Sequence, residues 1–379
     1  MHTSSHQTRI YQTKIITLEE AREHIRNGYF ALDPHCHSSY SFDVPDAKET
    51  SPESVTRTQK ILGLRNIISD HDTLNGYNHL KKKGYTKIIP GVELTFRPLI
   101  ARKIDIKKSM HTLHINIFGL NNNDLAILGD IAKTGNLDEL VKYMRQNDLE
   151  WMYNHPLWHA NHEHLNWKVI PGLAKNYFDV IELNGSFSKY MNDIALGIAQ
   201  NLNKGIIASS DSHSGNPGTG FVLAEGKNFH DFWSNVKEGN MYIVRRDMST
   251  LNVVRESSMM INQAFNARTR SIDGKKYIPS TNVKPFDMIV KSVTSGKLKN
   301  KFITKKVIQM LMQSVNYSAG PILAWRLHTI KDEKKADHLR YKIESLTRKI
   351  KQIEANIKRI EHPRKNPEVI RIEKYTTRK

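Results

Sequence analysis

The chain has 379 residues, of which 39% are hydrophobic and 25% are charged. This length suits two or three domains, and the composition excludes collagen-like, disulfide-scaffold and wholly disordered chains. The single cysteine, Cys36, excludes an internal disulfide and predicts a reducing, cytoplasmic location. No apolar run reaches the ~18 residues of a membrane span, and residues 1–14 lack the apolar core of a secretory signal, so we expect neither feature.

Short strand-like segments alternate with helical segments from residue 17 to residue 245. The strands are expected at 29–33, 65–69, 87–92, 112–118, 150–154, 179–183, 205–210 and 241–245. The helices are expected at 17–27, 52–62, 74–83, 137–147, 188–203 and 229–238. Thr17 with Glu20 has the spacing of a capping box, and Ser51 precedes Pro52 as an N-cap precedes a first helical position. This alternation predicts an α/β fold built on a parallel sheet or barrel.

The last ninety residues have a different pattern. From Lys301 onward the chain is helical in character, and an a/d heptad stripe runs through residues 336–360. The stripe fits a helix that packs within the chain, for example on a helix near 303–315, and it also fits a homodimeric coiled coil. The expected organisation is a helical lead-in at 1–28, a barrel at 29–248, a linker or irregular cap at 249–300 and a helical tail at 301–379.

Most of the net charge of +19 lies in this tail. Residues 291–379 contain 23 basic and 8 acidic residues, whereas the rest of the chain is nearly neutral. A basic helical tail indicates a polyanionic partner, and nucleic acid contacted through these helices would be bound without sequence preference and in a salt-sensitive way. An acidic protein or an anionic membrane surface is the alternative partner.

Histidine and carboxylate side chains recur where the predicted strands end. His35 and His37 follow the first strand as HxH, and Asp211 and His213 follow the 205–210 strand as DSH. Because residues i and i+2 of an extended chain point to the same side, each pair can reach one ion. In α/β barrels catalytic groups gather at the carboxyl ends of the strands. The other members of the set are His71 in SDHD, Glu93 in PGVE, His114 in the 112–118 strand and His155 in NHP.

A set of this kind predicts a cluster of divalent cations. Carboxylates held close together repel one another and neighbouring imidazoles leave lone pairs unused, and bound cations relieve both costs. Mixed histidine and carboxylate ligation without thiolate suits Zn, Mn or Fe. Such a multinuclear site activates water and neutralises a phosphate under attack.

The ordered motifs HxH, a following Asp, DH, GVE, His, NHP and DxH resemble those of the PHP (polymerase and histidinol phosphatase) metal-dependent phosphoesterases. The resemblance covers residues 30–245. It implies a distorted (β/α)7 barrel with two or three divalent metal ions (Mn, Zn or Fe) on its C-terminal rim.

The resemblance also implies a role for each motif residue. One ion would be held by His35, His37, Glu93 and Asp211, a second by Glu93, His114 and His155, and a third by Asp43, His71 and His213. A hydroxide bridging two ions would attack phosphorus in line with the leaving oxygen. The catalytic residues implied are His35, His37, Glu93, His155 and Asp211.

Two positions depart from the family pattern or leave a choice. The family often places its first Asp where this chain has Phe42, and Asp43 comes one residue later. His111 and His114 are three residues apart near one strand, so they point to opposite faces and only one should bind an ion. We choose His114, because the following INIFGL resembles the family's run after its ligand, and we expect His111→Ala to be nearly silent.

Other polar residues near the strand ends have secondary roles in this interpretation. Arg97, Arg245 and Arg246 follow predicted strands and are candidates for binding the substrate phosphate. Cys36 should face away from the ions as a small buried residue. Asp33, Asp70 and Asp72 fit either a role in orienting imidazoles or a role in turns and caps. His159, His162 and His164 are expected on a loop over the site, where they would touch substrate rather than metal.

The function predicted from these residues is a metal-dependent phosphoesterase whose substrate is nucleic acid or a nucleotide. A small-molecule phosphomonoesterase is one alternative. The other is a non-catalytic, metal-stabilised binding or assembly protein that uses the basic tail and a homodimer through residues 336–360.

Overall fold

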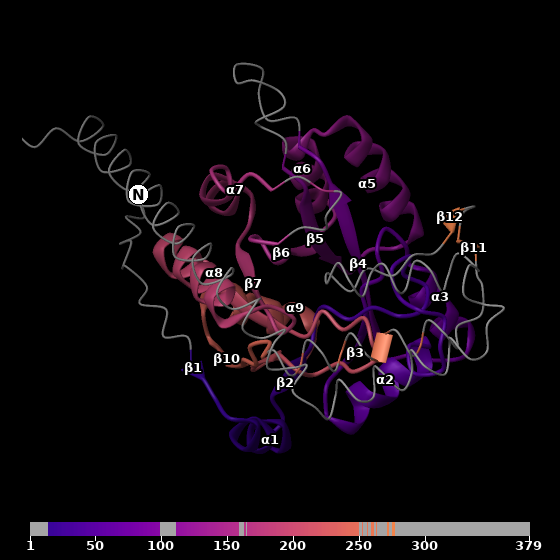
Figure 1. Ribbon diagram of the computed structural model, residues 1–379. Helices are drawn as coiled ribbons and strands as arrows, with labels where there is room; N and C mark the ends of the chain where they lie inside the picture. The colour runs from indigo at the N-terminus through magenta and orange to yellow at the C-terminus, as the bar shows by residue number, and fades with distance from the viewer. Residues whose placement is uncertain are drawn as a thin grey trace, which may run out of the picture.

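The computed structural model describes residues 14–98, 111–158, 163 and 165–249, together with nine further positions between 252 and 276. The predicted tail at 301–379, its heptad stripe and the histidines at 159, 162 and 164 lie outside these residues, as does most of the expected linker. The described chain forms a mixed α/β structure in which helices surround a curled sheet (Figure 1). None of the helices in the described residues is long and apolar enough to cross a lipid bilayer.

Two sheets organise the strands. The larger sheet has the order β3-β4-β5-β6-β7-β8, with β3 (Asn66–Ile68), β4 (Ile88–Phe96), β5 (Leu113–Phe118), β6 (Glu150–Tyr153), β7 (Val180–Asn184) and β8 (Gly205–Ser209). The smaller sheet has the order β1-β10-β9-β2, with β1 (Lys14–Ile15), β10 (Met241–Val244), β9 (Phe221–Ala224) and β2 (Phe30–Leu32). A separate short pair joins β11 (Ser271–Ile272) to β12 (Lys275–Lys276).

Backbone hydrogen bonds connect β2 and the residues after it to both edges of the larger sheet. On one side the amide of Arg65 donates to the carbonyl of Ala31 at 2.8 Å. On the other side Cys36 forms a parallel bridge with Ser212, just beyond β8. The β2 segment therefore lies between β3 and β8, and the curled sheet becomes a distorted, barrel-like arrangement, in agreement with the expected fold class at this level.

The expectation of a parallel sheet is wrong for β5. This strand pairs antiparallel with β4 and with β6, whereas β3 with β4, β6 with β7 and β7 with β8 are parallel pairs. Phe96 at the end of β4 lies opposite Leu113 at the start of β5, so the two strands run in opposite directions. Parallel neighbours would instead require a crossover connection.

Local capping explains where several helices begin and end. The Thr17 side chain and Glu20 form the expected capping box of α1 (Leu18–Arg26), and Ser51 caps α2 (Pro52–Ile61). Gly239 ends α9 (Phe229–Glu238) in the left-handed conformation, with φ at 81°. The other expected helices are α3 (Asn75–Lys82), α6 (Leu137–Gln146) and α8 (Lys189–Leu202).

Sequence patterns missed two helices and one interior strand. These are α5 (Asn122–Thr134), α7 (Ile170–Tyr177) and β9. The polar run at the start of α5 has the composition of a turn, yet the Asn121 side chain accepts hydrogen bonds from the amides of Asn123 and Asp124 and caps the helix.

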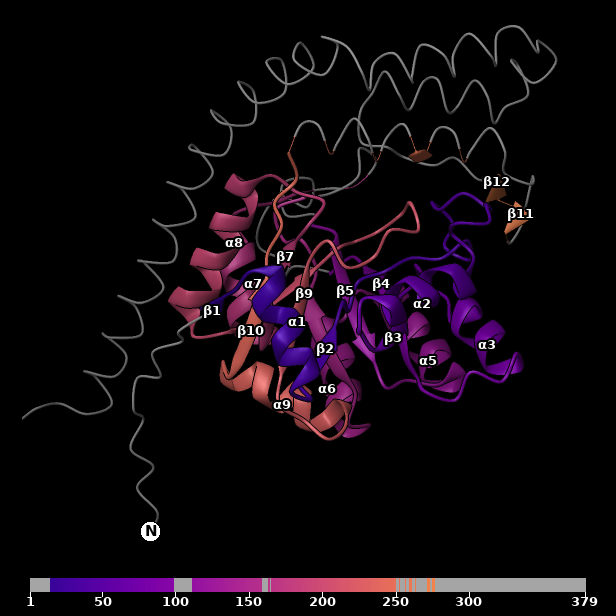
Figure 2. The same ribbon diagram turned by 90° about the horizontal axis from the view of Figure 1, so that it is seen from below.

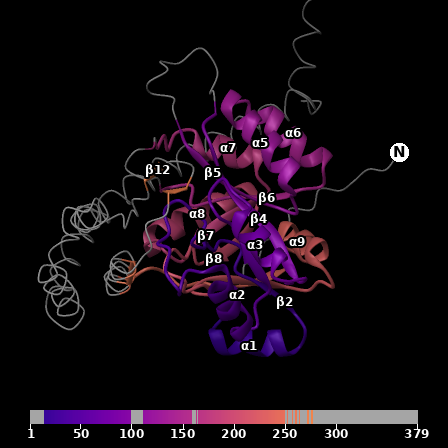
Figure 3. The ribbon, with the colours of Figure 1, turned by 90° about the vertical axis from the view of Figure 1, so that its right-hand side faces the viewer.

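The helices pack their apolar sides on the outside of the sheets. α5 and α6 lie side by side (Figures 1 and 3), and α1 packs on β9 and β10 (Figure 2). One continuous core joins the strands of the larger sheet to α5 through α9, and Trp233 of α9 is fully buried in it. Burial of an aromatic or large aliphatic side chain contributes about 1.5–3 kcal/mol. This packing holds the strands that position the polar cluster described next.

Candidate metal centre

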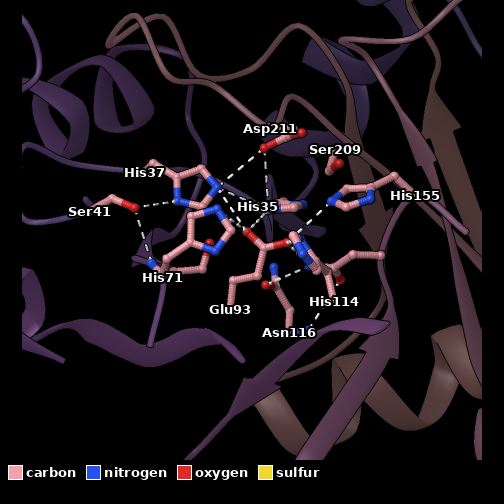
Figure 4. Close-up of polar contacts among 12 residues, drawn as sticks. His35, His37, Ser41, His71, Glu93, His114, Asn116, His155, Ser209 and Asp211 are labelled. Carbon is pink, nitrogen blue, oxygen red and sulfur yellow. Dashed lines mark hydrogen bonds and ion pairs between the residues drawn. The ribbon is translucent and has the colours of Figure 1, made fainter. Parts of the chain in front are cut away.

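The polar residues expected at the strand ends meet at one edge of the barrel-like sheet (Figure 4). His35 and His37 follow β2, His71 follows β3, His155 follows β6, and Asp211 follows β8. Glu93 lies within β4 rather than after it, since β4 extends to Phe96. His114 is the second residue of β5, and the reversed direction of that strand brings its amino end to the same edge, opposite Thr95.

Glu93 occupies the centre of the cluster, and its two carboxylate oxygens face different imidazoles. Oε1 lies 3.0 Å from Nδ1 of His114 and 3.2 Å from Nε2 of His155. Only 1% of the residue is exposed. On the other side, Oε2 of Glu93 lies 2.9 Å from Nε2 of His35, 3.2 Å from Nε2 of His37 and 3.3 Å from Nε2 of His71.

Asp211 faces the same pair of imidazoles as Glu93. Its Oδ1 atom lies 3.3 Å from Nε2 of His35 and 3.2 Å from Nε2 of His37. Asn184 donates to the other carboxylate oxygen at 3.1 Å. The Asp211 backbone has a φ of 49°, in the left-handed region that a non-glycine residue rarely adopts. The local conformation is thus strained at a residue that the predicted site uses.

Asp43 lies beside a third set of imidazoles. Its Oδ2 atom is 2.8 Å from Nε2 of His213 and 3.3 Å from Nε2 of His71, and Ser41 donates to its Oδ1 at 2.8 Å. Phe42, at the position where the family often has its Asp, places its ring 4.9 Å from the His71 ring. The one-residue displacement in sequence therefore leaves a carboxylate facing the cluster.

The donor atoms form four groups in which one atom from each member lies within 4.8 Å of the others. The membership of these groups differs from that of the predicted sets, because His37 also belongs to the group that contains Asp43 and His155 is grouped with His35. The groups are His35, His37, Glu93 and Asp211; His37, Asp43, His71 and His213; His71, Glu93 and His114; and His35, His155 and Glu182.

The chemistry of these donors fits divalent cations. The Nε2 atoms of His35 and His37 are only 3.1 Å apart, so at least one of them must lack a proton or the two would repel. Oδ1 of Asp211 is buried, and although two imidazoles lie close to it, no described residue donates a hydrogen bond to it with suitable geometry. A cation between these atoms would accept the unused lone pairs and offset the carboxylate charge.

At this site burial and charge pairing shift the pKa values of the side chains in opposite directions. Burial alone would raise the pKa of Glu93, but His35, His71 and His114 outweigh it and hold this pKa well below its usual range. Burial alone would lower the pKa of His114, but Glu93 and Glu163 outweigh it and raise the pKa to about 10. Asp43 and Asp211 raise the pKa of His213 to about 10 in the same way, against burial. Ions that bind here would therefore have to displace protons.

Sequence reasoning missed Glu182. This fully buried residue of β7 accepts hydrogen bonds from the amide of His155 at 2.7 Å and from the hydroxyl of Ser209 at 2.5 Å, and it lies 2.7 Å from Nδ1 of His35. The predicted 179–183 strand had no assigned ligand. The sequence did contain a signal for this residue, namely a carboxylate within the otherwise apolar run VIEL, because a buried charge requires partners.

The aspartates that flank the ligands bind backbone groups. Asp33 accepts from the amides of Ser210 and Gly218 at 2.9 and 2.6 Å, Asp70 from the amide of Ser38 at 2.6 Å, and Asp72 from the amide of Thr95 at 2.9 Å. These bonds fit a role of the three aspartates in turns and caps better than a role in orienting imidazoles. Cys36 is fully buried, and its sulfur lies 3.6 Å from the Ser210 hydroxyl.

His111 and Arg245 contact residues that are not among the predicted ligands. His111 is buried and its Nε2 atom lies 2.8 Å from the Tyr153 hydroxyl. Arg245 donates to Asp193 at 2.7 Å and to Asp247 at 2.8 Å, so two carboxylates already engage it. Arg97 and Arg246 are exposed.

No family model matches the sequence, and no curated protein matches it. Among solved structures, PsfC from Pseudomonas syringae PB-5123 aligns with a TM-score of 0.41 and 12% identity over 62% of this chain and 98% of its own. The lesion-specific endonuclease PfuEndoQ from Pyrococcus furiosus aligns with a TM-score of 0.40 and 19% identity over 57% of each chain.

A third solved structure, from Bifidobacterium adolescentis, is provisionally described as a metal-dependent phosphoesterase. It aligns with a TM-score of 0.33 and 14% identity over 48% of this chain and 87% of its own. All three scores are below 0.5, so the site residues and not these similarities carry the functional proposal.

Proposed function

We propose that this chain is a PHP-type metal-dependent phosphoesterase, a hydrolase whose substrate is nucleic acid or a nucleotide. The observation that carries the proposal is the position of Glu93. Its two oxygens face separate sets of imidazoles at 2.9–3.3 Å, as expected of a carboxylate shared between neighbouring ions. The nine residues proposed as ligands for two or three Mn, Zn or Fe ions are His35, His37, Asp43, His71, Glu93, His114, His155, Asp211 and His213.

The proposed reaction is hydrolysis of a phosphate ester. The oxygen of water forms a new bond to phosphorus, the bond from phosphorus to the ester oxygen breaks, and the departing oxygen takes a proton from the water. Bound divalent ions would lower the pKa of that water and neutralise charge on the phosphoryl oxygens.

The chain supplies the fixed positions for this chemistry. Buried carboxylates hold the imidazoles from several strands in one place, and Asn184 and Asn154 donate hydrogen bonds to Asp211 and Glu93 at 3.1 and 2.9 Å. Carboxylates restrained in this way keep their orientation without ions, so little reorganisation is needed when a substrate arrives.

The test is hydrolysis by manganese-loaded protein of p-nitrophenyl phosphate and of a short single-stranded oligonucleotide. Asp211→Asn should lower the rate by at least about 100-fold, because loss of a residue that only orients a metal ligand already costs about 10–100-fold and Asp211 is proposed as a ligand itself. Asparagine tolerates the left-handed backbone at this position, so the fold should be kept. Asp130→Asn, on the exposed side of α5, is the matched control. Folded, metal-loaded protein that is inactive on both substrates would exclude the proposal.

A further inference from the structure

Aromatic side chains lie at both ends of the cluster. Phe42 is 44% exposed although its ring lies against that of His71. At the other end, the ring of Trp158 lies 5.2 Å from that of His155 and meets it edge to face. Phe187 lies 5.3 Å from Trp158 and 5.7 Å from His155, so the three rings form a continuous aromatic surface.

These two surfaces flank the central carboxylate. His71, which Phe42 contacts, faces Oε2 of Glu93, whereas His155, which Trp158 contacts, faces Oε1. A phosphate held beside Glu93 would therefore have an aromatic surface on each side. A hollow beside His155, lined by Trp158, Phe187 and Met191, lies at the second surface.

The exposed ring of Phe42 lies beside a proposed metal ligand. An apolar ring that remains in water contributes less to stability than a buried one. A flat ligand stacked on Phe42 would remove this apolar surface from water. Trp158 and Phe187, which are partly buried, offer the same type of contact on the other side.

We infer that the site binds a phosphodiester that carries a flat aromatic ring on each side of the phosphate, namely single-stranded nucleic acid with its two flanking bases on Phe42 and Trp158. This inference rests on the proposed function and narrows its substrate class to a diester. A phosphomonoester has one organic substituent and would occupy only one of the two surfaces. Stacking on aromatic side chains tolerates any base, so cleavage would show little sequence preference.

The products follow from the reaction already stated. Water adds to phosphorus, one bond from phosphorus to a sugar oxygen breaks, and that oxygen leaves as a hydroxyl group. The other nucleoside keeps a phosphomonoester.

The experiment compares the thymidine dinucleotide TpT with an analogue that lacks both bases, using manganese-loaded protein. Wild-type protein should hydrolyse TpT with a kcat/KM about 10-fold or more above that of the analogue, given the usual strength of base stacking. Phe42→Leu and Trp158→Leu should each raise the KM for TpT by about 10-fold and lower the ratio of kcat/KM for TpT to kcat/KM for the analogue.

Two further variants control for loss of structure. Trp158→Phe keeps an aromatic ring and should restore most of the affinity for TpT. Tyr29→Leu removes an aromatic residue that directly precedes β2, at the end of that strand farther from the ligands, and should not change the kinetics of either substrate.

Equal kcat/KM values for TpT and the analogue, or unchanged KM in both leucine variants, would overturn the inference. Hydrolysis of p-nitrophenyl phosphate without hydrolysis of TpT would also overturn it and leave the proposed function standing. Inactivity on all of these substrates and on the single-stranded oligonucleotide would exclude the proposed function and the inference with it.

Discussion

The Nδ1 atom of His35 lies 2.7 Å from Oε1 of Glu182, and both side chains are completely buried. A histidine that donates from Nδ1 presents Nε2 as its other ring atom, and here Nε2 faces Glu93 and Asp211. Carboxylate partners of this kind fix the tautomer and the ring orientation of metal-binding histidines. Glu182 also accepts the amide hydrogen of His155, whose φ of 22° is unusual, so it braces two proposed ligands at once.

Replacement of Glu182 by glutamine should therefore weaken metal binding without removing a ligand. We expect the dissociation constant for Mn²⁺ to rise by about 10–100-fold, because glutamine can no longer accept hydrogen bonds on both terminal atoms. Isothermal titration calorimetry on the metal-free protein would measure the change. Glu225→Gln, at the residue directly after β9, is the control. A Glu182→Gln protein with wild-type affinity would show that this residue only fills the core.

His111 and His114 should respond differently to replacement by alanine. His114→Ala should lower the number of ions bound per chain, as measured by elemental analysis, because it removes a partner of Glu93. His111→Ala should keep the ion count but lower the free energy of unfolding by about 2–4 kcal/mol, since the buried Tyr153 hydroxyl loses a donor and the amide of Asn166 loses an acceptor.

The expectation that His111→Ala is nearly silent thus applies to metal binding and not to stability. His230→Ala, at a residue whose side chain is 77% exposed, should change neither quantity. Loss of bound metal in His111→Ala would overturn the choice of His114 as the ligand.

Glu53 of α2 interacts with two basic side chains in and directly after α3, and this interaction predicts a contribution to the free energy of unfolding that depends on pH. Burial would raise the pKa of Glu53, but hydrogen bonds from Lys83 and His79 lower it from 4.5 to about 2. Because the folded-state value is the lower one, the pairing stabilises the fold fully above pH 4.5 and is lost as the pH falls towards 2.

Glu53→Gln should accordingly lower the melting temperature at pH 7, and the difference from wild type should shrink between pH 5 and pH 3. Thermal melts followed by circular dichroism at each pH would measure it. Glu49→Gln, an exposed neighbour, should show no such trend. A difference that is constant with pH would mean that the charge of Glu53 does not contribute.

The basic tail can be tested separately from the site. Removal of residues 330–379 should leave hydrolysis of p-nitrophenyl phosphate unchanged and weaken the binding of single-stranded DNA, because many of the chain's excess positive charges are removed. Fluorescence anisotropy at two salt concentrations would measure affinity and its salt dependence. Equal affinity in the full and shortened chains would show that nucleic acid does not contact the tail.

Much of the local structure was readable from residue patterns. Thr17 with Glu20, Ser51 with Pro52, and Gly239 mark helix ends through hydrogen bonds and backbone angles that depend on a few neighbouring residues. The chemical type of the site was readable too, because histidines and carboxylates recur after short apolar strands, and such groups are costly to bury without ions or partners.

The relations between distant segments were not readable in this way. Three of them are the antiparallel direction of β5, the contact of Glu182 with His35, and the pairing of Arg245 with Asp193. Each depends on segments that are far apart along the chain or that run in opposite directions. Composition and spacing describe each segment alone, whereas these contacts depend on how the strands curl and which edges meet. Local interactions therefore specified most of the helices, residue types specified the donors, and the packing of the whole chain specified which donors face one another.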